Sequence, residues 1–125
     1  MSHTHENRDD KVSLVEMGPR DGLQNEAATL PLAQRLALIA RLAESGLQRI
    51  EVGAFVSPKK VPQMADSAAL FNALPRRGPT RYGALVPNLQ GLQAAIAARA
   101  DEIGLFTACS DGFTRANIGI SVEES

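Results

Sequence analysis

The feature that most constrains the fold of this chain is a regular alternation of strand-like and helix-like segments. Strands are predicted over residues 11–17, 47–55, 80–87 and 101–106, and helices over residues 29–46, 61–74 and 88–100. Strands that alternate with helices imply parallel pairing and right-handed crossovers. With about 30 residues per unit, the pattern matches a (β/α) barrel or an open doubly wound sheet. Residues 18–22, GPRDG, lack the G-x-G-x-x-G spacing of a dinucleotide-binding turn, which weakens the doubly wound alternative.

Each predicted helix has an apolar face, and two have clear end signals. Thr29 and Pro31 suit the start of the first helix, Gly46 suits its end, and Asn88 is a natural N-cap for the third. The side chains predicted to face the core are Leu32, Leu36, Ile39 and Ala43 in the first helix, Val61, Met64, Ala68 and Phe71 in the second, and Leu89, Leu92 and Ile96 in the third.

The amino-acid composition excludes several classes of protein. The 125 residues suit one domain, and 44% hydrophobic residues are enough for a core. A formal net charge of -1 gives no reason to expect nucleic acid or a membrane as partner, and no apolar run could span a bilayer. The single cysteine, Cys109, excludes an internal disulfide and fits a reducing, cytoplasmic compartment. Residues 1–11 are expected to be a disordered tail in which His3 and His5 are solvated rather than metal-binding.

Unusual polar residues collect where the predicted strands end. The segments concerned are residues 18–26, Glu51 with residues 53–64, residues 87–88 and residues 106–119, whereas the connections at the opposite end are ordinary turns. Parallel α/β proteins bind their ligands at the carboxyl ends of the strands. The asymmetry therefore indicates a site on one face of the sheet.

Arg20 and Asp21 are the sharpest candidates at this face. Asp21 offers a hard oxygen ligand suited to Mg²⁺ or Mn²⁺, and Arg20 offers a permanent cation able to hold an oxyanion. The alternative is a solvated turn in which both only keep the loop soluble. Glu51 sits in an apolar strand, where a carboxylate is usually paired, and Arg20 is the expected partner. That pair has either a functional or a purely structural role.

Other polar residues near the strand ends carry weaker signals. Lys59 and Lys60 could meet phosphates, but such a pair more often belongs to a solvated loop. Cys109 has no activating base nearby in the sequence and is expected to be a small, semi-buried thiol rather than a nucleophile. Thr114 and Asn117 could bind polar ligand groups or only satisfy the loop backbone.

Four long stretches resemble the 3-hydroxy-3-methylglutaryl-CoA lyase family. They are VEMGPRDGLQNE, IEVGAFVSPKKVPQMAD, LVPNLQG and FTACSDGFTRANIGISVEES, and the resemblance runs in consistent order from about Val12 to the last residue. The family belongs to the metal-dependent lyases and condensing enzymes built on a TIM barrel. The resemblance implies an α/β fold, a (β/α)8 TIM barrel of which residues 12–125 form about the first four β/α units.

The resemblance also implies roles for individual residues. Asp21 would be a ligand to a divalent metal, Arg20 would stabilise the enolate oxygen of the departing acetyl-CoA, and Glu51 would orient Arg20. Gln24 would lie beside the metal and the acyl-CoA substrate. The implied reaction is a retro-Claisen cleavage of 3-hydroxy-3-methylglutaryl-CoA into acetoacetate and acetyl-CoA, as in leucine degradation and ketone-body formation. A homo-oligomer is implied for the full-length enzyme.

The chain departs from the family pattern and lacks part of it. Lys60 stands where the family often has Trp, and Ala54 where Ser is usual, which should tune the loop rather than the chemistry. The family takes an H-x-H pair, an Asn and its catalytic cysteine from the second half of the barrel. His3 and His5 are at the wrong end to replace that pair, and Cys109 is not that thiol.

Two alternatives to a lyase stay open. One is a condensing synthase of the same superfamily, and the other is a non-catalytic α/β module that binds a CoA-like or carboxylate ligand. Synthases such as isopropylmalate synthase carry the R-D-G-x-Q element after Thr-Leu. Here Gly18-Pro19 precedes the element and Asn25-Glu26 follows it, which favours the lyase branch.

The sequence ends on SVEES, a capping-box pattern in which Ser121 and Glu124 exchange hydrogen bonds at the start of a helix. With the β-α rhythm, this pattern predicts that the chain is the N-terminal half of a longer enzyme. We expect such a half-barrel to be inactive alone, since one carboxylate cannot hold a metal. We also expect its two open parallel edges to cause self-association.

Overall fold

The computed structural model describes residues 11–124, apart from the side chains of Asn117 and Ile118. Three parallel strands form one sheet in the order β1 (Arg49–Ala54), β2 (Arg81–Leu85) and β3 (Glu102–Gly104). The predicted α/β organisation with parallel pairing is therefore confirmed over this range. The predicted tail of residues 1–11, including His3 and His5, lies outside the described residues except for Lys11.

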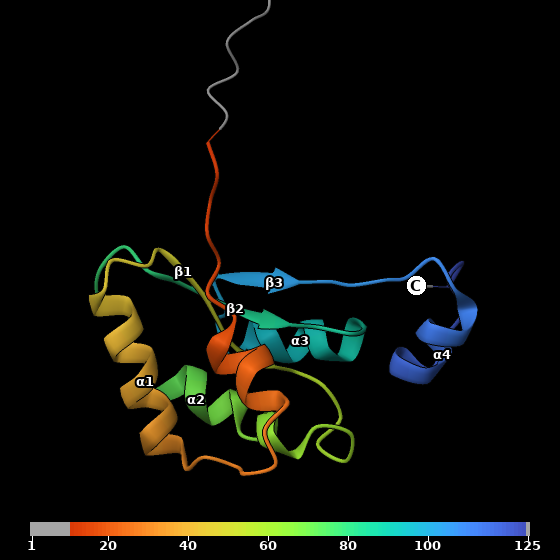
Figure 1. The fold of residues 1–125 in the computed structure, drawn as a ribbon, viewed down its shortest axis with the longest axis horizontal. Coiled ribbons are helices and arrows are strands. Elements are labelled where there is room, and N and C mark those ends of the chain that lie inside the picture. Colours follow the sequence, from red (N-terminus) through yellow and green to blue (C-terminus); the bar gives the residue numbers. More distant parts are fainter. Residues whose placement is uncertain (1–10, 125) are drawn as a thin grey trace, which may run out of the picture.

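The first predicted strand is reduced to a single bridge. Glu16 pairs in parallel with Ile50, through a hydrogen bond from the Glu16 N–H to the Arg49 carbonyl at 3.0 Å and one from the Glu51 N–H to the Glu16 carbonyl at 2.9 Å. Residues 11–15 run away from the body of the protein (Figure 1). Val12 is 86% exposed, so the alternating apolar side chains of this segment do not pack against the rest of the protein. The prediction of a full strand over residues 11–17 was wrong for this reason.

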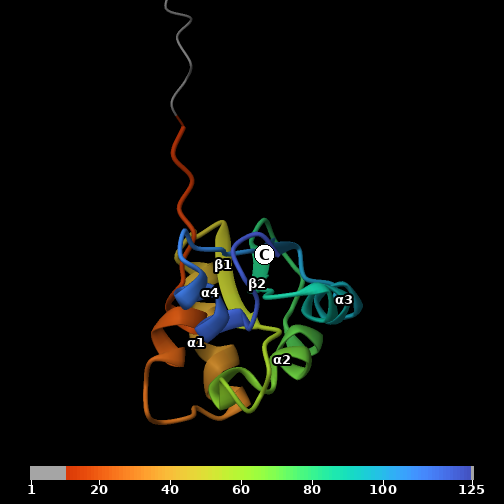
Figure 2. The ribbon, with the colours of Figure 1, turned by 90° about the vertical axis from the view of Figure 1, so that its right-hand side faces the viewer.

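Three helices, α1 (Leu32–Glu44), α2 (Ser67–Ala73) and α3 (Leu89–Ala97), lie on the same side of the sheet (Figures 1 and 2). The helix predicted over residues 61–74 begins later than expected, because a short 3-10 turn at Pro62–Met64 precedes α2. A fourth helix, α4 (Asp111–Ile118), lies apart from the others beyond the end of β3 (Figure 1). Among the described residues, no helix is long and apolar enough to cross a membrane.

The core lies between the sheet and the helices. Its buried members are Ile39, Ile50, Val52, Leu70, Phe71, Leu74, Tyr82, Ala84 and Ala98. The inward face predicted for α1 is confirmed, because Ile39 is fully buried and Leu32, Leu36 and Ala43 pack against this cluster.

The inward face predicted for α3 was wrong at Leu89 and Ile96, whereas Leu92 is half-buried. Leu89 is 69% exposed and Ile96 is 66% exposed, whereas Gly91 and Ala95 are buried. A Cβ atom on Gly91 would lie 2.6 Å from the backbone oxygen of Phe55, so only a residue without a side chain lets the helix approach this closely. The fully buried residues of this helix are therefore its small ones.

The caps predicted at Asn88 and Ser121 are present, whereas α1 has Pro31 at its N-cap position and no side-chain cap. The Asn88 side chain accepts a hydrogen bond from the Gly91 N–H at 2.8 Å at the start of α3. The Ser121 N–H donates to the Glu124 carboxylate at 2.9 Å, and the Glu124 N–H donates to the Ser121 hydroxyl at 3.3 Å. This reciprocal pair is the predicted capping box.

Candidate active site

The turn after the Glu16 bridge is a π-helical turn, η1 (Gly18–Gly22). The Met17 carbonyl accepts hydrogen bonds from the N–H groups of Arg20, Asp21 and Gly22, at 3.1, 2.8 and 3.4 Å. The Asn25 amide also donates to the Asp21 carbonyl at 2.8 Å. Turns of this kind are rare and often occur at functional sites. The turn places Arg20 beside Glu51 of β1, with Asp21 next to it.

Arg20 and Glu51 form a buried ion pair. The Arg20 Nε donates to Glu51 Oε1 at 2.5 Å, and both side chains are about nine-tenths buried. The Arg20 Nη1 also lies 3.2 Å from Asp21 Oδ1 and 3.5 Å from Gln24 Oε1. The pairing expected from the sequence is therefore present. It leaves a guanidinium fixed at the strand exits, where a permanent cation can meet a developing negative charge.

Glycines on the neighbouring strands make room for this pair. A Cβ atom on Gly104 of β3 would lie 3.2 Å from Glu51 Oε2, closer than most side-chain contacts. Gly83 of β2 is the partner of Glu51 in the sheet. Sequence reasoning did not identify these glycines as part of the site, although glycine inside a strand is a signal of close approach.

A shallow hollow of about 190 Å³ lies on the sheet face that bears Glu51. Its lining residues are Val15, Met17, Arg49, Ile50, Glu51, Gly83, Glu102, Ile103 and Gly104. Two residues before Glu51, the Arg49 Nε lies 2.9 Å from Glu102 Oε2 and forms an ion pair with it. The hollow therefore combines three charged side chains with apolar ones such as Val15 and Ile103.

Asp21 fits the donor chemistry of Mg²⁺ or Mn²⁺, but only as one ligand. Its carboxylate is 60% exposed at the mouth of the turn, and carboxylate oxygen is the donor that these ions prefer. Among the described residues, no three His, Cys, Asp or Glu side chains gather closely enough to hold a metal ion. The described part of the chain thus offers a single oxygen donor group to such a site.

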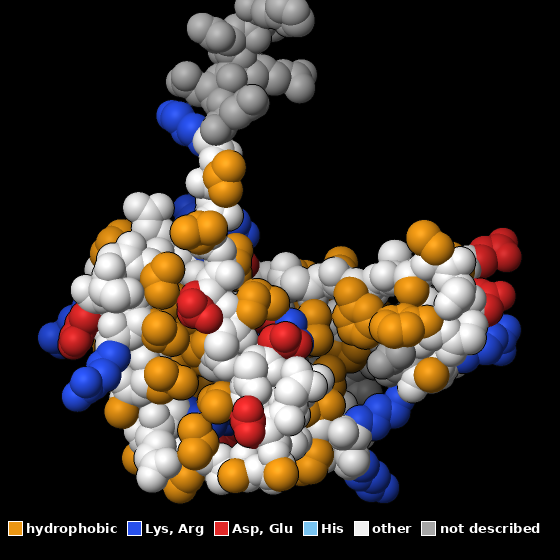
Figure 3. Space-filling model, viewed as in Figure 1, with side chains coloured by type: hydrophobic (Ala, Val, Ile, Leu, Met, Phe, Trp, Pro, Cys, Tyr) orange, Lys and Arg blue, Asp and Glu red, His pale blue; other side chains and the backbone are white. Residues whose placement is uncertain are grey.

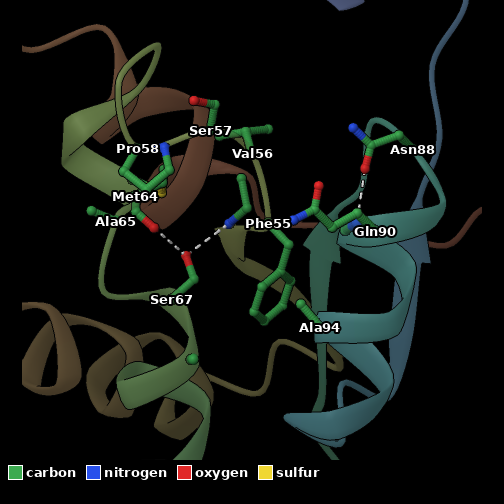
Figure 4. A pocket seen from close by; sticks show the side chains of 13 residues that line it. Phe55, Val56, Ser57, Pro58, Met64, Ala65, Ser67, Asn88, Gln90 and Ala94 are labelled. Atoms are coloured by element: carbon green, nitrogen blue, oxygen red, sulfur yellow. Dashed lines mark hydrogen bonds between the residues drawn. The ribbon is translucent and has the colours of Figure 1, made fainter.

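A larger hollow of about 400 Å³ lies on the helix side, between the loop after β1 and the start of α3 (Figure 4). It brings together two of the predicted strand exits, including Phe55, Ser57 and Asn88. Its buried Ser67 hydroxyl accepts from the Ala54 N–H at 3.0 Å and donates to the Met64 carbonyl at 2.7 Å. Because this hydroxyl and the capping amide of Asn88 serve the chain itself, we assign no chemistry to this hollow.

The other candidate residues do not join Arg20. Cys109 is exposed, not semi-buried as expected, because the segment after β3 leaves the sheet. Thr114 is buried, and its hydroxyl donates to the Ser110 and Asp111 carbonyls, so it satisfies its own helix. Lys59 and Lys60 are exposed in the turn after β1. The side chain of Asn117 lies outside the described residues.

Comparison with known proteins identifies the family. A family model described as HMGL-like matches residues 11–125. The chain belongs to the HMGL-like family. Enzymes of the HMGL-like family are metal-dependent, and their superfamily has the TIM-barrel fold. The three-stranded parallel sheet is consistent with an incomplete barrel of this type.

Curated relatives in this family are lyases. A 3-hydroxy-3-isohexenylglutaryl-CoA/hydroxy-methylglutaryl-CoA lyase of Pseudomonas aeruginosa is 48% identical over 115 residues, which cover 92% of this chain and 38% of that protein. The mitochondrial hydroxymethylglutaryl-CoA lyase of Gallus gallus is 49% identical, with 92% and 39% covered. A cytoplasmic 3-hydroxy-3-methylglutaryl-CoA lyase of Rattus norvegicus is 50% identical, with 91% and 33% covered. The chain spans less than two fifths of the length of these relatives.

Solved structures of HMG-CoA lyases have the same fold over this part. The enzyme from Brucella melitensis matches with a TM-score of 0.85 at 50% identity, covering 90% of this chain and 40% of that one. The enzyme from Acinetobacter baumannii, in complex with coenzyme A and 3-methylmalate, matches with a TM-score of 0.88 at 34% identity, covering 99% and 39%.

Proposed function

We propose that this chain forms the first four β/α units of a (β/α)8 barrel and one side of the active site of a hydroxymethylglutaryl-CoA lyase. The observation that carries the proposal is the buried Arg20–Glu51 pair beside the exposed Asp21 carboxylate at the strand exits. The lyase names of relatives about half identical to this chain support it, and favour a lyase over a condensing synthase.

The proposed reaction cleaves 3-hydroxy-3-methylglutaryl-CoA. The substrate's 3-hydroxyl loses its proton, the adjacent carbon–carbon bond breaks to give the ketone of acetoacetate, and the bonding electrons pass to the enolate of acetyl-CoA, which is then protonated on carbon. Arg20 stabilises the enolate oxygen, and Glu51 holds the guanidinium in the orientation that this requires. Gln24, which lies beside Arg20, contacts the substrate.

A divalent metal is part of the proposal. Asp21 would supply one carboxylate to Mg²⁺ or Mn²⁺, and such an ion would lower the pKa of the substrate hydroxyl. We further propose an acyl-CoA substrate, a cytoplasmic location, a homo-oligomeric full-length enzyme and a role in leucine degradation and ketone-body formation. The cytoplasmic and CoA-bound relatives support two of these points, although other relatives are mitochondrial.

The first test is a chimera. Residues 11–125 replace the matching segment of the Pseudomonas aeruginosa lyase, and acetoacetate release is measured with Mg²⁺. We expect the chimera to be active and Arg20→Met within it to lower kcat about a thousandfold, because the enolate loses its cation. Glu51→Gln should cost less, about a hundredfold, since it only misplaces Arg20. A folded chimera without activity would contradict the proposal.

The second test uses the 125-residue chain alone. We expect no acetoacetate release, because Asp21 is the single ligand that residues 11–124 offer to the proposed metal site. Turnover near that of an intact lyase would contradict this expectation. Tight binding of CoA by the chain without any metal dependence would instead favour the non-catalytic binding module.

A further inference from the structure

Strand β1 contains a bulge directly after Glu51. The pairing of β1 with β2 shifts so that Glu51 and Gly53 face successive β2 residues, and Val52 has no partner residue there. The Val52 side chain lies in the core on the helix side. A Cβ atom on Gly53 would point to the same side, 2.7 Å from the Ser67 hydroxyl oxygen. Val52 and Gly53 therefore both face the helices, which breaks the strand alternation directly after Glu51.

The carbonyl of the bulged residue is held by a buried arginine. Arg35 of α1 is 1% exposed, and its Nη2 donates to the Val52 carbonyl at 3.2 Å. Its Nη1 forms an ion pair with the Asp66 carboxylate and donates to the Gln63 carbonyl at 3.4 Å. One side chain thus joins α1, the bulge of β1 and the junction that precedes α2.

Burying the Arg35 guanidinium carries a free-energy cost that its contacts offset only in part. Within the described part of the chain, the Arg35 Nε is buried without a hydrogen-bond partner. The Asp66 side chain makes no capping bond at the start of α2, although it occupies the N-cap position, and pairs with Arg35 instead. Replacing a buried ion pair by apolar side chains of similar volume is often neutral for stability. We therefore expect the contacts of Arg35 to hold the bulge in place more than to raise the free energy of unfolding.

We propose that Arg35 is a positioning residue for the Arg20–Glu51 pair. By holding the Val52 carbonyl, it fixes the bulge, and the bulge fixes the direction from which Glu51 reaches Arg20. The effect of Arg35 on the geometry of the pair does not depend on the reaction. Its effect on catalysis rests on the lyase function proposed above.

The test measures the geometry without substrate or metal. Hydrogen exchange of the Arg20 Nε–H is followed by NMR in the 125-residue chain, since this proton lies in the 2.5 Å bond to Glu51. We expect Arg35→Met, which keeps the volume of the side chain, to speed this exchange about tenfold through local opening. Arg35→Lys keeps a charge for Asp66 but cannot reach all three acceptors, and we expect a smaller acceleration.

The matched control is Arg76→Met. Arg76 also links a helix side to the sheet, over the rings of Phe71 and Tyr82, but it does not touch the bulge. We expect this variant to leave the Arg20 exchange rate unchanged. Unchanged exchange in folded Arg35 variants, equal acceleration in Arg76→Met, or failure of both Arg35 variants to fold would overturn the proposal. None of these results depends on whether the chimera cleaves its substrate.

Discussion

At the scale of single residues, the Arg20–Glu51 pair should dominate the energetics of the site. Glu51→Gln leaves a buried guanidinium without its counter-charge, and we expect the free energy of unfolding to fall by about 3 kcal/mol. The control is Glu102→Gln on the same face, whose pair with Arg49 is partly exposed and should cost under about 1 kcal/mol. Urea unfolding measures both, and equal losses would contradict the assigned difference in burial.

The capping box makes a prediction about pH. Hydrogen bonds from the Ser121 N–H and hydroxyl hold the pKa of Glu124 below its ordinary value. Because the folded pKa is the lower one, the stabilisation is present above the unfolded pKa and is lost as pH falls through the folded pKa. The Ser121 amide shift, followed by NMR, should therefore titrate below the usual range of glutamate. In Ser121→Ala the Glu124 carboxyl should titrate higher, and an unchanged midpoint would contradict this cause.

At the scale of elements, two helix glycines should respond in opposite directions to the same substitution. Gly91→Ala in α3 forces a Cβ against the Phe55 carbonyl, and we expect a loss of about 2 kcal/mol. Gly112→Ala in α4 meets no atom within 4 Å, and it should stabilise by up to about 1 kcal/mol through helix propensity. Thermal unfolding compares them. A neutral Gly91→Ala would show that α3 does not need the close approach.

At the scale of the whole molecule, several of the exposed apolar residues lie where the described sheet ends. Leu105 is 73% exposed, and Figure 3 shows hydrophobic side chains around the hollow between the body and the lobe of α4. Residues 11–15 at the opposite edge are also exposed. Unpaired strand edges with apolar side chains favour association with other chains.

We therefore expect the 125-residue chain to self-associate as its concentration rises. The double substitution Leu105→Lys and Phe106→Lys should weaken the association, because charges on an edge oppose pairing. The control, Gln90→Lys with Gln93→Lys, adds the same charge at exposed positions of α3 and should leave association unchanged. Sedimentation velocity measures the result. A concentration-independent monomer with cooperative melting, from the unsubstituted chain, would contradict the expectation.

Much of the fold and part of the site could be predicted because they depend on short-range chemistry. Apolar periodicity and capping residues identified α1, the start of α3 and the alternation of strands with helices. The Arg20–Glu51 pair was predictable because neighbouring parallel strands end at the same edge, and a carboxylate inside an apolar strand needs a partner. These inferences require only the order of residues and elementary rules of pairing.

Tertiary structure alone decided which surfaces are covered. Residues 11–15 alternate like a strand but stay exposed. Helix α3 turns Leu89 and Ile96 outward, and Gly91 allows a closer approach on its inner side. The bulge at Val52 and its contact with Arg35 also depend on how α1 packs against β1. The physical reason is that periodicity identifies an apolar face, but the energy of burying that face depends on a second surface distant in sequence.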